Sequence, residues 1–296
     1  MNWMIVTDSS CDLREIADAA DVGYQQVPFV MNISDKDFVD DDTLDVPGMV
    51  DAMEASEKSH SACPSPSAWQ EAFEKADHVI AMTISGRLSG SYNSAMTARE
   101  MVLEEHPDKQ IEVIDSLSTG PKLVLMVNRA AEMIKGSESF DAVCAACREI
   151  ASSFRTIFTL SNFHNLVTNG RVPKVAGVIA GALGIRVIGV GSKEGEIRMK
   201  EPVRGENRAL KRIVKDMEDH GYDGSPMAIS HCLNPDLASS LISQIQSVWQ
   251  SAKVQLLPTR GLDSYYAERG GLIICYRATD ETKLEKILSK AKPQQA

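Results

Sequence analysis

Residues 78–105 read HVIAMTISGRLSGSYNSAMTAREMVLEE. The apolar run at 78–84 predicts a buried strand, and the polar segment with glycines at 85–94 predicts a loop. Residues 92–105 then predict a helix. This order of strand, loop and helix is typical of a sheet whose strands run parallel and are covered by helices.

The same order extends through the first half of the chain. Helices are predicted to begin at Asp12 and to span 119–135 and 139–151. Further strands are predicted at 3–7, 24–33, 111–114 and 155–160. The strand at 24–33 should be irregular, because Pro28 has no N–H to donate to a neighbouring strand.

The second half has a different pattern. Two strands at 185–190 and 196–203 flank a glycine-containing turn, which indicates a hairpin, and the helices and strands that follow alternate up to a last helix at 280–290. A hairpin among alternating elements predicts a mixed sheet and a separate domain. We therefore expect an α/β protein with a mostly parallel, Rossmann-like domain at 1–160 and a mixed-sheet domain at 161–296.

Composition excludes several classes of protein. The chain of 296 residues has 31 basic and 41 acidic side chains, a net charge of −10, which argues against non-specific nucleic-acid binding. It contains no apolar run long enough to span a membrane and does not open with a secretory signal. Its 6 cysteines are dispersed, which is typical of reduced thiols, so we expect a cytoplasmic protein.

Two further features have an ordinary structural interpretation. The acidic segment 35–57 includes Asp40, Asp41 and Asp42, but it lacks the spacing and the glycine of a calcium loop. We interpret it as a solvated loop and helix start. Cys144 and Cys147 lie within a predicted helix without a second cysteine pair at zinc-site spacing, so they are interpreted as core thiols. We expect no metal site and no cofactor.

The loop at 85–94 has the composition of an anion site. It combines two glycines, four serines and the start of a helix within ten residues. Glycine allows close approach of the backbone, and a helix N-terminus offers free N–H groups. Neither a P-loop nor a dinucleotide fingerprint occurs, and Arg87 is the one nearby cation, so a carboxylate fits better than a phosphate. An equally good interpretation is that the serines merely cap the helix.

Five segments together carry a resemblance to a known family. They are Ile5-Val6-Thr7-Asp8-Ser9-Ser10-Cys11-Asp12-Leu13, Ser61-Ala62-Cys63-Pro64-Ser65, the stretch from Ile84 to Ala95, Val113-Ile114-Asp115-Ser116 and Asn169-Gly170-Arg171-Val172. In this order and spacing the chain resembles the DegV family of fatty-acid-binding proteins. The resemblance implies a two-domain α/β fold with a lipid tunnel between the domains.

The family resemblance also implies a function. Members hold one long-chain fatty acid and present its carboxylate to an ATP-dependent fatty-acid kinase subunit, without catalytic machinery of their own. On this resemblance the chain is not an enzyme and is a monomer. Ser61, Ser89 and Ser91 would hold the carboxylate, while Arg171 and Arg204 would face the kinase.

The chain departs from the family near its end. Glu268 stands where the family has a histidine that contacts the carboxylate, and a glutamate there would repel the ligand unless one group is protonated. We therefore count Glu268 among the candidate lipid-binding residues, with three arrangements left open. Glu268 points away, Arg269 turns in, or a hydroxyl of Ser264, Tyr265 or Tyr266 donates instead.

Two further expectations concern the rest of the site. Apolar side chains and glycines between Pro173 and Gly184 predict a helix, and their spacing alone favours simple packing on the sheet of the second domain. The family resemblance implies instead that this helix lines the lipid tunnel. A different class of function uses the same cleft for a small carboxylate or phosphorylated ligand, as an enzyme or binding protein, with Glu268 or Asp8 as the catalytic group.

Overall fold

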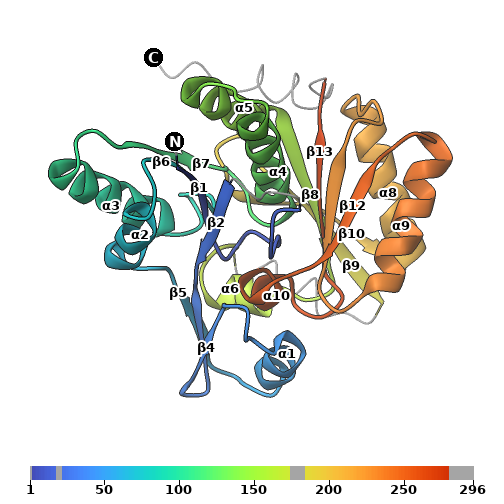
Figure 1. Ribbon diagram of the computed structural model, residues 1–296. Coiled ribbons are helices and arrows are strands. Elements are labelled where there is room, and N and C mark those ends of the chain that lie inside the picture. Colours follow the sequence, from blue (N-terminus) through green and yellow to red (C-terminus); the bar gives the residue numbers. More distant parts are fainter. Residues whose placement is uncertain (1, 18–21, 174–183, 280–296) are drawn as a thin grey trace, which may run out of the picture.

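The computed structural model describes residues 2–17, 22–173 and 184–279 (Figure 1). A four-stranded parallel sheet has the strand order β2-β1-β6-β7. Its strands are β1 (Trp3–Asp8), β2 (Val22–Val27), β6 (His78–Thr83) and β7 (Gln110–Asp115). All four strands end at the same edge, so the loops that follow β1, β6 and β7 meet there.

A second sheet of six mixed strands has the order β10-β9-β8-β13-β11-β12. Its strands are β8 (Phe154–Leu160), β9 (Ile185–Gly191), β10 (Ile197–Arg204), β11 (Met227–His231), β12 (Val254–Pro258) and β13 (Leu272–Arg277). The hairpin predicted from the sequence is formed by the antiparallel strands β9 and β10. The mixed sheet confirms the expected α/β class.

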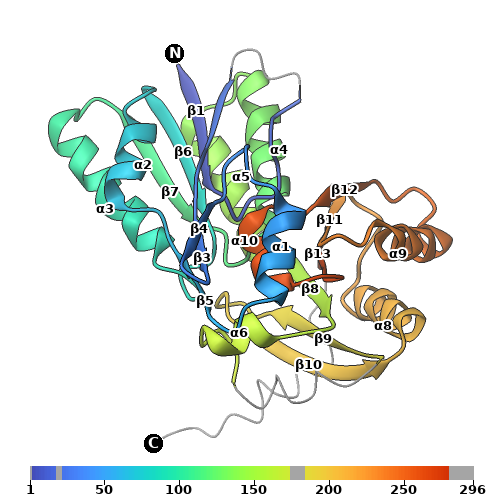
Figure 2. The ribbon, with the colours of Figure 1, turned by 90° about the horizontal axis from the view of Figure 1, so that it is seen from below.

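A third, three-stranded antiparallel sheet has the order β4-β3-β5. It consists of β3 (Val30–Ile33), β4 (Lys36–Val39) and β5 (Ser59–Ala62). Three helices lie beside it: α1 (Val46–Glu54), α6 (His164–Thr168) and α10 (Gly261–Ala267). Figure 2 shows α10 beside α1, near the middle of the molecule.

The helices and the two larger sheets form alternating layers. α2 (Pro66–Phe73) and α3 (Ser91–Glu105) cover the outer face of the parallel sheet, and α8 (Glu206–Asp219) and α9 (Pro235–Val248) cover that of the mixed sheet (Figure 1). α4 (Pro121–Lys135) and α5 (Phe140–Ser153) lie between the sheets and contact both. The two sheets therefore share one buried layer.

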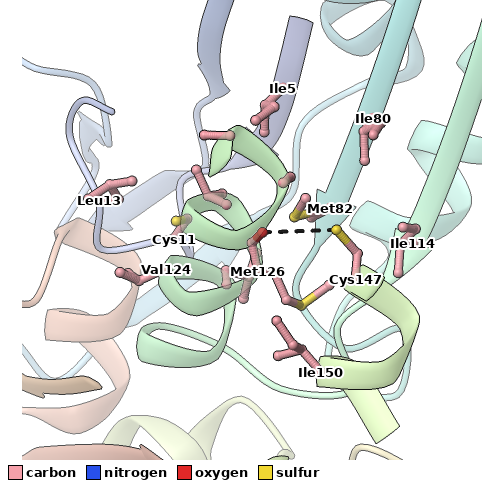
Figure 3. Packing of buried hydrophobic residues seen from close by; sticks show 14 of the residues in the cluster. Ile5, Cys11, Leu13, Ile80, Met82, Ile114, Val124, Met126, Cys147 and Ile150 are labelled. Atoms are coloured by element: carbon pink, nitrogen blue, oxygen red, sulfur yellow. Dashed lines mark hydrogen bonds between the residues drawn. The ribbon is translucent and has the colours of Figure 1, made fainter. Parts of the chain in front are cut away.

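Buried side chains from both halves of the chain fill this shared layer. Figure 3 shows Cys11 and Met82 packed against Val124 and Met126 of α4, with Cys147 of α5 beside them. Cys144 and Cys147 are both buried, as expected for core thiols. Burial raises the pKa of the Cys147 thiol to about 12, so this group stays protonated.

The helix predicted from Asp12 does not form, because residues 9–17 are an irregular loop. The carbonyl oxygens of Cys11 and Leu13 accept hydrogen bonds from side chains of β2, namely Gln26 Nε2 at 2.7 Å and Tyr24 Oη at 3.1 Å. These carbonyls therefore do not accept from N–H groups four residues on, as a helix requires.

The interpretation of 35–57 as solvated is wrong for Asp40. This side chain is 1% exposed and caps the N-terminus of α10, accepting from Gly261 N and Leu262 N at 2.8 Å each. Its partners lie more than two hundred residues away along the chain, which local sequence cannot reveal.

Two predicted helices lie outside the described residues. The tunnel-lining helix falls mostly on residues 174–183, and the last helix falls on 280–290. The division into domains at 1–160 and 161–296 stays a prediction. β8, which ends at Leu160, belongs to the mixed sheet.

Candidate functional site

Asp8, the last residue of β1, accepts hydrogen bonds from both ends of the loop that follows β6. Asp8 Oδ2 accepts from Ile84 N at 3.0 Å and from Ser91 Oγ at 2.6 Å. Asp8 Oδ1 accepts from Ser10 Oγ at 2.5 Å and Ser10 N at 3.3 Å. Burial raises the pKa of Asp8 to about 6 despite these donors. Asp8 therefore fixes the shape of the serine loop.

Two serines of this loop have different environments. Ser91 is fully buried and its single hydroxyl proton goes to Asp8, so its side chain points into the fold. Ser89 is partly buried and its Oγ accepts from Ser91 N at 3.3 Å, which leaves the Ser89 hydroxyl proton for another acceptor.

Ser61 lies in β5, one residue before its end, and its Oγ is 2.8 Å from Tyr266 Oη of α10. Both side chains are partly buried. This contact joins residues that are 205 positions apart along the chain. Two hydroxyls in contact have two protons between them and use one on each other, so one proton remains for a ligand.

Arg171 connects this pair to the serine loop. Its guanidinium carbon lies 5.7 Å from the centroid of the Tyr266 ring, a cation–π arrangement. Arg171 Nε donates to Leu88 O at 3.2 Å and Nη1 to Asn169 O at 2.6 Å. These contacts join a set of polar residues that we call the headgroup cluster. It consists of Ser61, Tyr266, Arg171 and the loop at Leu88–Ser89.

Arg204 is not part of this cluster. It lies exposed at the end of β10, in register with Ile185 of β9. Within the described part of the chain it makes no hydrogen bond to the headgroup cluster.

Glu268 follows α10 and has a structural role. Its backbone φ is +54°, and its carboxyl oxygen Oε1 accepts from Asn165 N, in the first turn of α6, at 3.0 Å. The side chain is 6% exposed, and burial raises its pKa to about 7. Glu268 therefore caps α6 and does not point at Ser61.

Arg269 does not turn in toward the headgroup cluster. It is exposed and pairs with Asp51 and Glu54 of α1, at 2.5 and 2.9 Å. Its positive charge is therefore paired with carboxylates of α1 at the surface, between α10 and α1.

The three hydroxyls near the end of α10 point to different partners. Ser264 Oγ is 2.7 Å from a threonine hydroxyl that precedes the helix, and Tyr265 Oη donates to Ser59 Oγ at 2.8 Å. Tyr266 is the one of the three that contacts Ser61. It is therefore the one of the three hydroxyls that belongs to the headgroup cluster.

A cavity of about 70 Å³ opens beside the headgroup cluster. Leu88 and Tyr266 form part of its wall, which ties the cavity to the cluster. The wall is mostly apolar and is contributed by β8, β10, β13, α6 and α10, through Phe158, Leu160, Leu166, Ile197, Ala267 and Ile273. A mostly apolar space beside a polar cluster suits a ligand that has an apolar tail and an anionic head.

The structure brings Ser61, Ser89 and Arg171 into one region, but the sequence does not show what holds them there. Asp8 as a loop anchor and Asp40 as the cap of α10 depend on contacts across the fold, as does the cap that Glu268 makes on α6. The one local signal was the position of Asp8 directly after a predicted buried strand.

Two other kinds of feature are missing from the described residues. Among residues 2–17, 22–173 and 184–279, no helix is both long enough and apolar enough to cross a membrane. In the same residues, three or more His, Cys, Asp or Glu side chains do not gather in a way that could hold a metal ion.

Comparison with known proteins gives matches along nearly the whole chain. The family model described as "Uncharacterised protein, DegV family COG1307" matches residues 2–277. A DegV domain-containing protein of Streptococcus pyogenes serotype M1 is 39% identical over 278 residues, 93% of this chain and 99% of that protein.

Solved structures are similar over the same extent. The Fatty Acid Kinase (Fak) B3 protein of Streptococcus pneumoniae, loaded with linoleic acid, has a TM-score of 0.91 and 36% identity over 94% of this chain and 100% of its own. A DegV family protein of Eubacterium eligens loaded with heptadecanoic acid has a TM-score of 0.89 and 36% identity, covering 93% of this chain and 100% of its own.

Proposed function

This chain belongs to the DegV family, and on that premise we propose that it binds one long-chain fatty acid with the carboxylate at the headgroup cluster. The observation that supports this most is the cavity itself. Its wall is mostly apolar and reaches the polar cluster at Leu88 and Tyr266. Two relatives at 36% identity were solved with linoleic acid and heptadecanoic acid bound.

In this proposal the headgroup cluster orients the ligand. Ser61 and Tyr266 offer a hydroxyl proton, Ser89 offers another, and Arg171 supplies a positive charge beside them. Hydrogen bonds to a charged group contribute about 1.5–3 kcal/mol each. Ser91 contributes indirectly, by holding the loop to Asp8. Glu268 caps α6, and this contact explains its buried position without any contact with the ligand.

The acyl chain would occupy the apolar cavity. Burying it contributes roughly 0.8 kcal/mol per methylene, so the tail supplies most of the affinity. Pockets for small molecules usually enclose about 300–1,000 Å³, whereas this cavity encloses about 70 Å³. A long acyl chain therefore needs more space than the cavity among the described residues encloses.

We further propose that the chain presents the bound carboxylate to a fatty-acid kinase subunit and supplies no catalytic group of its own. The similar Streptococcus pneumoniae protein is a fatty-acid kinase B3 protein. Arg171, at the cluster, and Arg204, exposed on β10, are the residues proposed to face this partner.

Native mass spectrometry of the purified protein, followed by solvent extraction, tests the ligand directly. We expect one fatty acid per chain, or uptake of one added oleate. The double variant S61A/Y266F should bind oleate at least about tenfold more weakly, since it removes the paired hydroxyls. The matched control S152A/Y222F alters an exposed serine of α5 and a tyrosine whose hydroxyl donates to Ser225 O. Equal affinity in both double variants would contradict the proposed headgroup site.

A further inference from the structure

Two aspartates meet at the start of α10. Asp12 lies in the loop after β1 and Asp263 in the first turn of α10, and each is 3% exposed. Asp12 Oδ1 accepts from Arg260 N at 2.8 Å, and Asp263 Oδ1 accepts from Thr119 Oγ1 at 2.6 Å. One oxygen of each carboxyl is therefore satisfied by a donor of the surrounding fold.

The second oxygen of each carboxyl converges on Gly120. A Cβ built on Gly120 would overlap Asp263 Oδ2 and lie 2.8 Å from Asp12 Oδ2. Both oxygens are buried, and neither has an N–H or O–H donor within hydrogen-bond distance among the described residues. Because both oxygens lie against the same point at Gly120, the two carboxyls face each other there, and each shifts the pKa of the other.

This contact has a chemical requirement. An ionised carboxylate can only accept hydrogen bonds, so two carboxyls can bond to each other only if one of them holds a proton. Paired carboxylates in a low-dielectric site share a proton for this reason. Burial acts in the same direction, raising the pKa of Asp12 to about 7 and that of Asp263 well above its ordinary value. The Ser230 hydroxyl makes no hydrogen bond within the described residues; it lowers the pKa of Asp12, but by less than burial raises it.

The charges around the pair come from several elements. Asp40, from the loop after β4, adds a negative charge, and the side chain of Arg260 beside it offsets that charge, with Nε 3.7 Å from Asp40 Oδ1. Cys11, on the same loop as Asp12, has a thiol whose pKa is raised to about 12 and is neutral. On α4, Lys122 directs its Nζ to a carbonyl oxygen of α5 at 3.0 Å. None of these described groups places a cation on the pair, so none replaces the shared proton.

We propose that Asp12 and Asp263 are positioning residues that hold one proton between them, and that loss of this proton moves α10 and weakens ligand binding at Tyr266. Asp263 and Tyr266 are three residues apart on one short helix and both line the cavity. Two adjacent negative charges would repel, and the helix they share with Tyr266 would shift. The inference rests on the proposed fatty-acid function and adds its dependence on pH.

Oleate affinity measured from pH 6 upward, as far as the protein stays folded, tests the proposal, because the last proton leaves the pair at the higher of its two pKa values. The wild-type affinity should fall by about fivefold or more over this range, a typical coupling between two sites. D263N should lose that dependence, because an asparagine can donate an N–H to Asp12 and still accept from Thr119. The control D141N removes one negative charge on α5, where Asp141 lies in the first turn, and should behave like the wild type.

D12N provides a second variant if D263N fails to fold, since its amide can donate to Asp263 while its oxygen accepts from Arg260 N. Infrared difference spectra of the ligand-free protein at pH 7 should show one protonated carboxyl in the wild type that D12N and D263N lack. Unchanged spectra and an unchanged pH profile in both variants would overturn the proposal.

Failure of the proposed fatty-acid binding and failure of the proposed role of Asp12 and Asp263 give different results. If no variant binds oleate at any pH, the proposed function fails, while the infrared signal still decides whether the proton is shared. If all variants bind oleate with the same pH profile, the function stands and the positioning role is wrong.

Discussion

Glu268 has a structural role at a position where the family resemblance implies contact with the ligand. Its carboxyl accepts from Asn165 N, and burial raises its pKa to about 7. We predict that E268Q, which keeps an acceptor oxygen, is at least as stable as the wild type at pH 8. E268A should lose about 1 kcal/mol, the usual effect of removing a helix cap.

Urea unfolding of both variants at pH 6 and pH 8 measures this prediction, with E138Q, a substitution between α4 and α5, as the control. Oleate binding by E268Q should match the wild type. A large loss of binding in E268Q with unchanged stability would indicate that Glu268 contacts the ligand.

At the scale of single residues, the sequence predicts those parts of the site that depend on residues close together along the chain. Serines and glycines beside a predicted helix start indicated the loop, and Ser61 and Arg171 do reach its neighbourhood. The inward direction of Ser91 and the cap made by Glu268 depend on partners from other elements. No local pattern contains that information.

Among the elements, α10 depends on a residue that lies far from it along the chain. Asp40 caps its N-terminus with both carboxyl oxygens, one to Gly261 N and one to Leu262 N. We predict that D40A destabilises the protein by about 1–2 kcal/mol, at the upper end for lost caps. D40N, which retains one acceptor, should lose less. Thermal unfolding checks this order, and an equal loss in both variants would contradict the capping role.

β9 offers a test of the apolar cavity that leaves the headgroup cluster intact. A Cβ on Gly189 would collide with the tip of the Phe158 ring, which lines the cavity. In G189A the ring must swing aside, and we expect it to reduce the space for the acyl tail. Affinity for oleate should fall about tenfold or more, since each excluded methylene removes roughly 0.8 kcal/mol.

Octanoate provides the comparison, because its short tail should fit G189A and the wild type more equally. Affinities of both ligands for both proteins, measured by calorimetry, give the result. An unchanged ratio of the two affinities would mean that the tail does not lie against Phe158.

Element prediction succeeded for segments with a strong pattern. The hairpin β9–β10 and the strands β1, β6 and β7 lie where the sequence indicates, and Pro28 falls between β2 and β3 as its missing N–H requires. α10 was missed because it is short and buried, and its start is set by Asp40 from another part of the chain.

For the whole molecule, buried carboxyls predict how stability depends on pH. Burial raises the pKa of Asp8 to about 6 and those of Asp12 and Glu268 to about 7. Between pH 4 and pH 7 the folded forms of these groups therefore bind more protons than the unfolded forms. Their contribution to the free energy of unfolding must then fall as the pH rises through this range.

Asp216 changes the free energy of unfolding in the opposite direction, and it does so at lower pH. Its pKa is lowered well below the ordinary value, with His220, Arg155 and Lys200 favouring the ionised form against its burial. Its stabilisation is lost as the pH falls below about 4. We expect maximal stability at about pH 4–5 and a loss of about 2 kcal/mol or more by pH 8. Urea unfolding across this range measures it, and stability that rises from pH 5 to pH 8 would contradict the prediction.

The order of strands in the mixed sheet has a consequence for synthesis on the ribosome. β13, the last described strand along the chain, lies between β8 and β11 and joins β10-β9-β8 to β11-β12. Until β13 leaves the ribosome, these two groups of strands have unpaired edges facing one another. The parallel sheet has all its strands before Ser116 and can pair much earlier. A stalled nascent chain ending before Leu272 should therefore resist protease in its first part while its second part is cleaved, and chaperones that cover strand edges would act there.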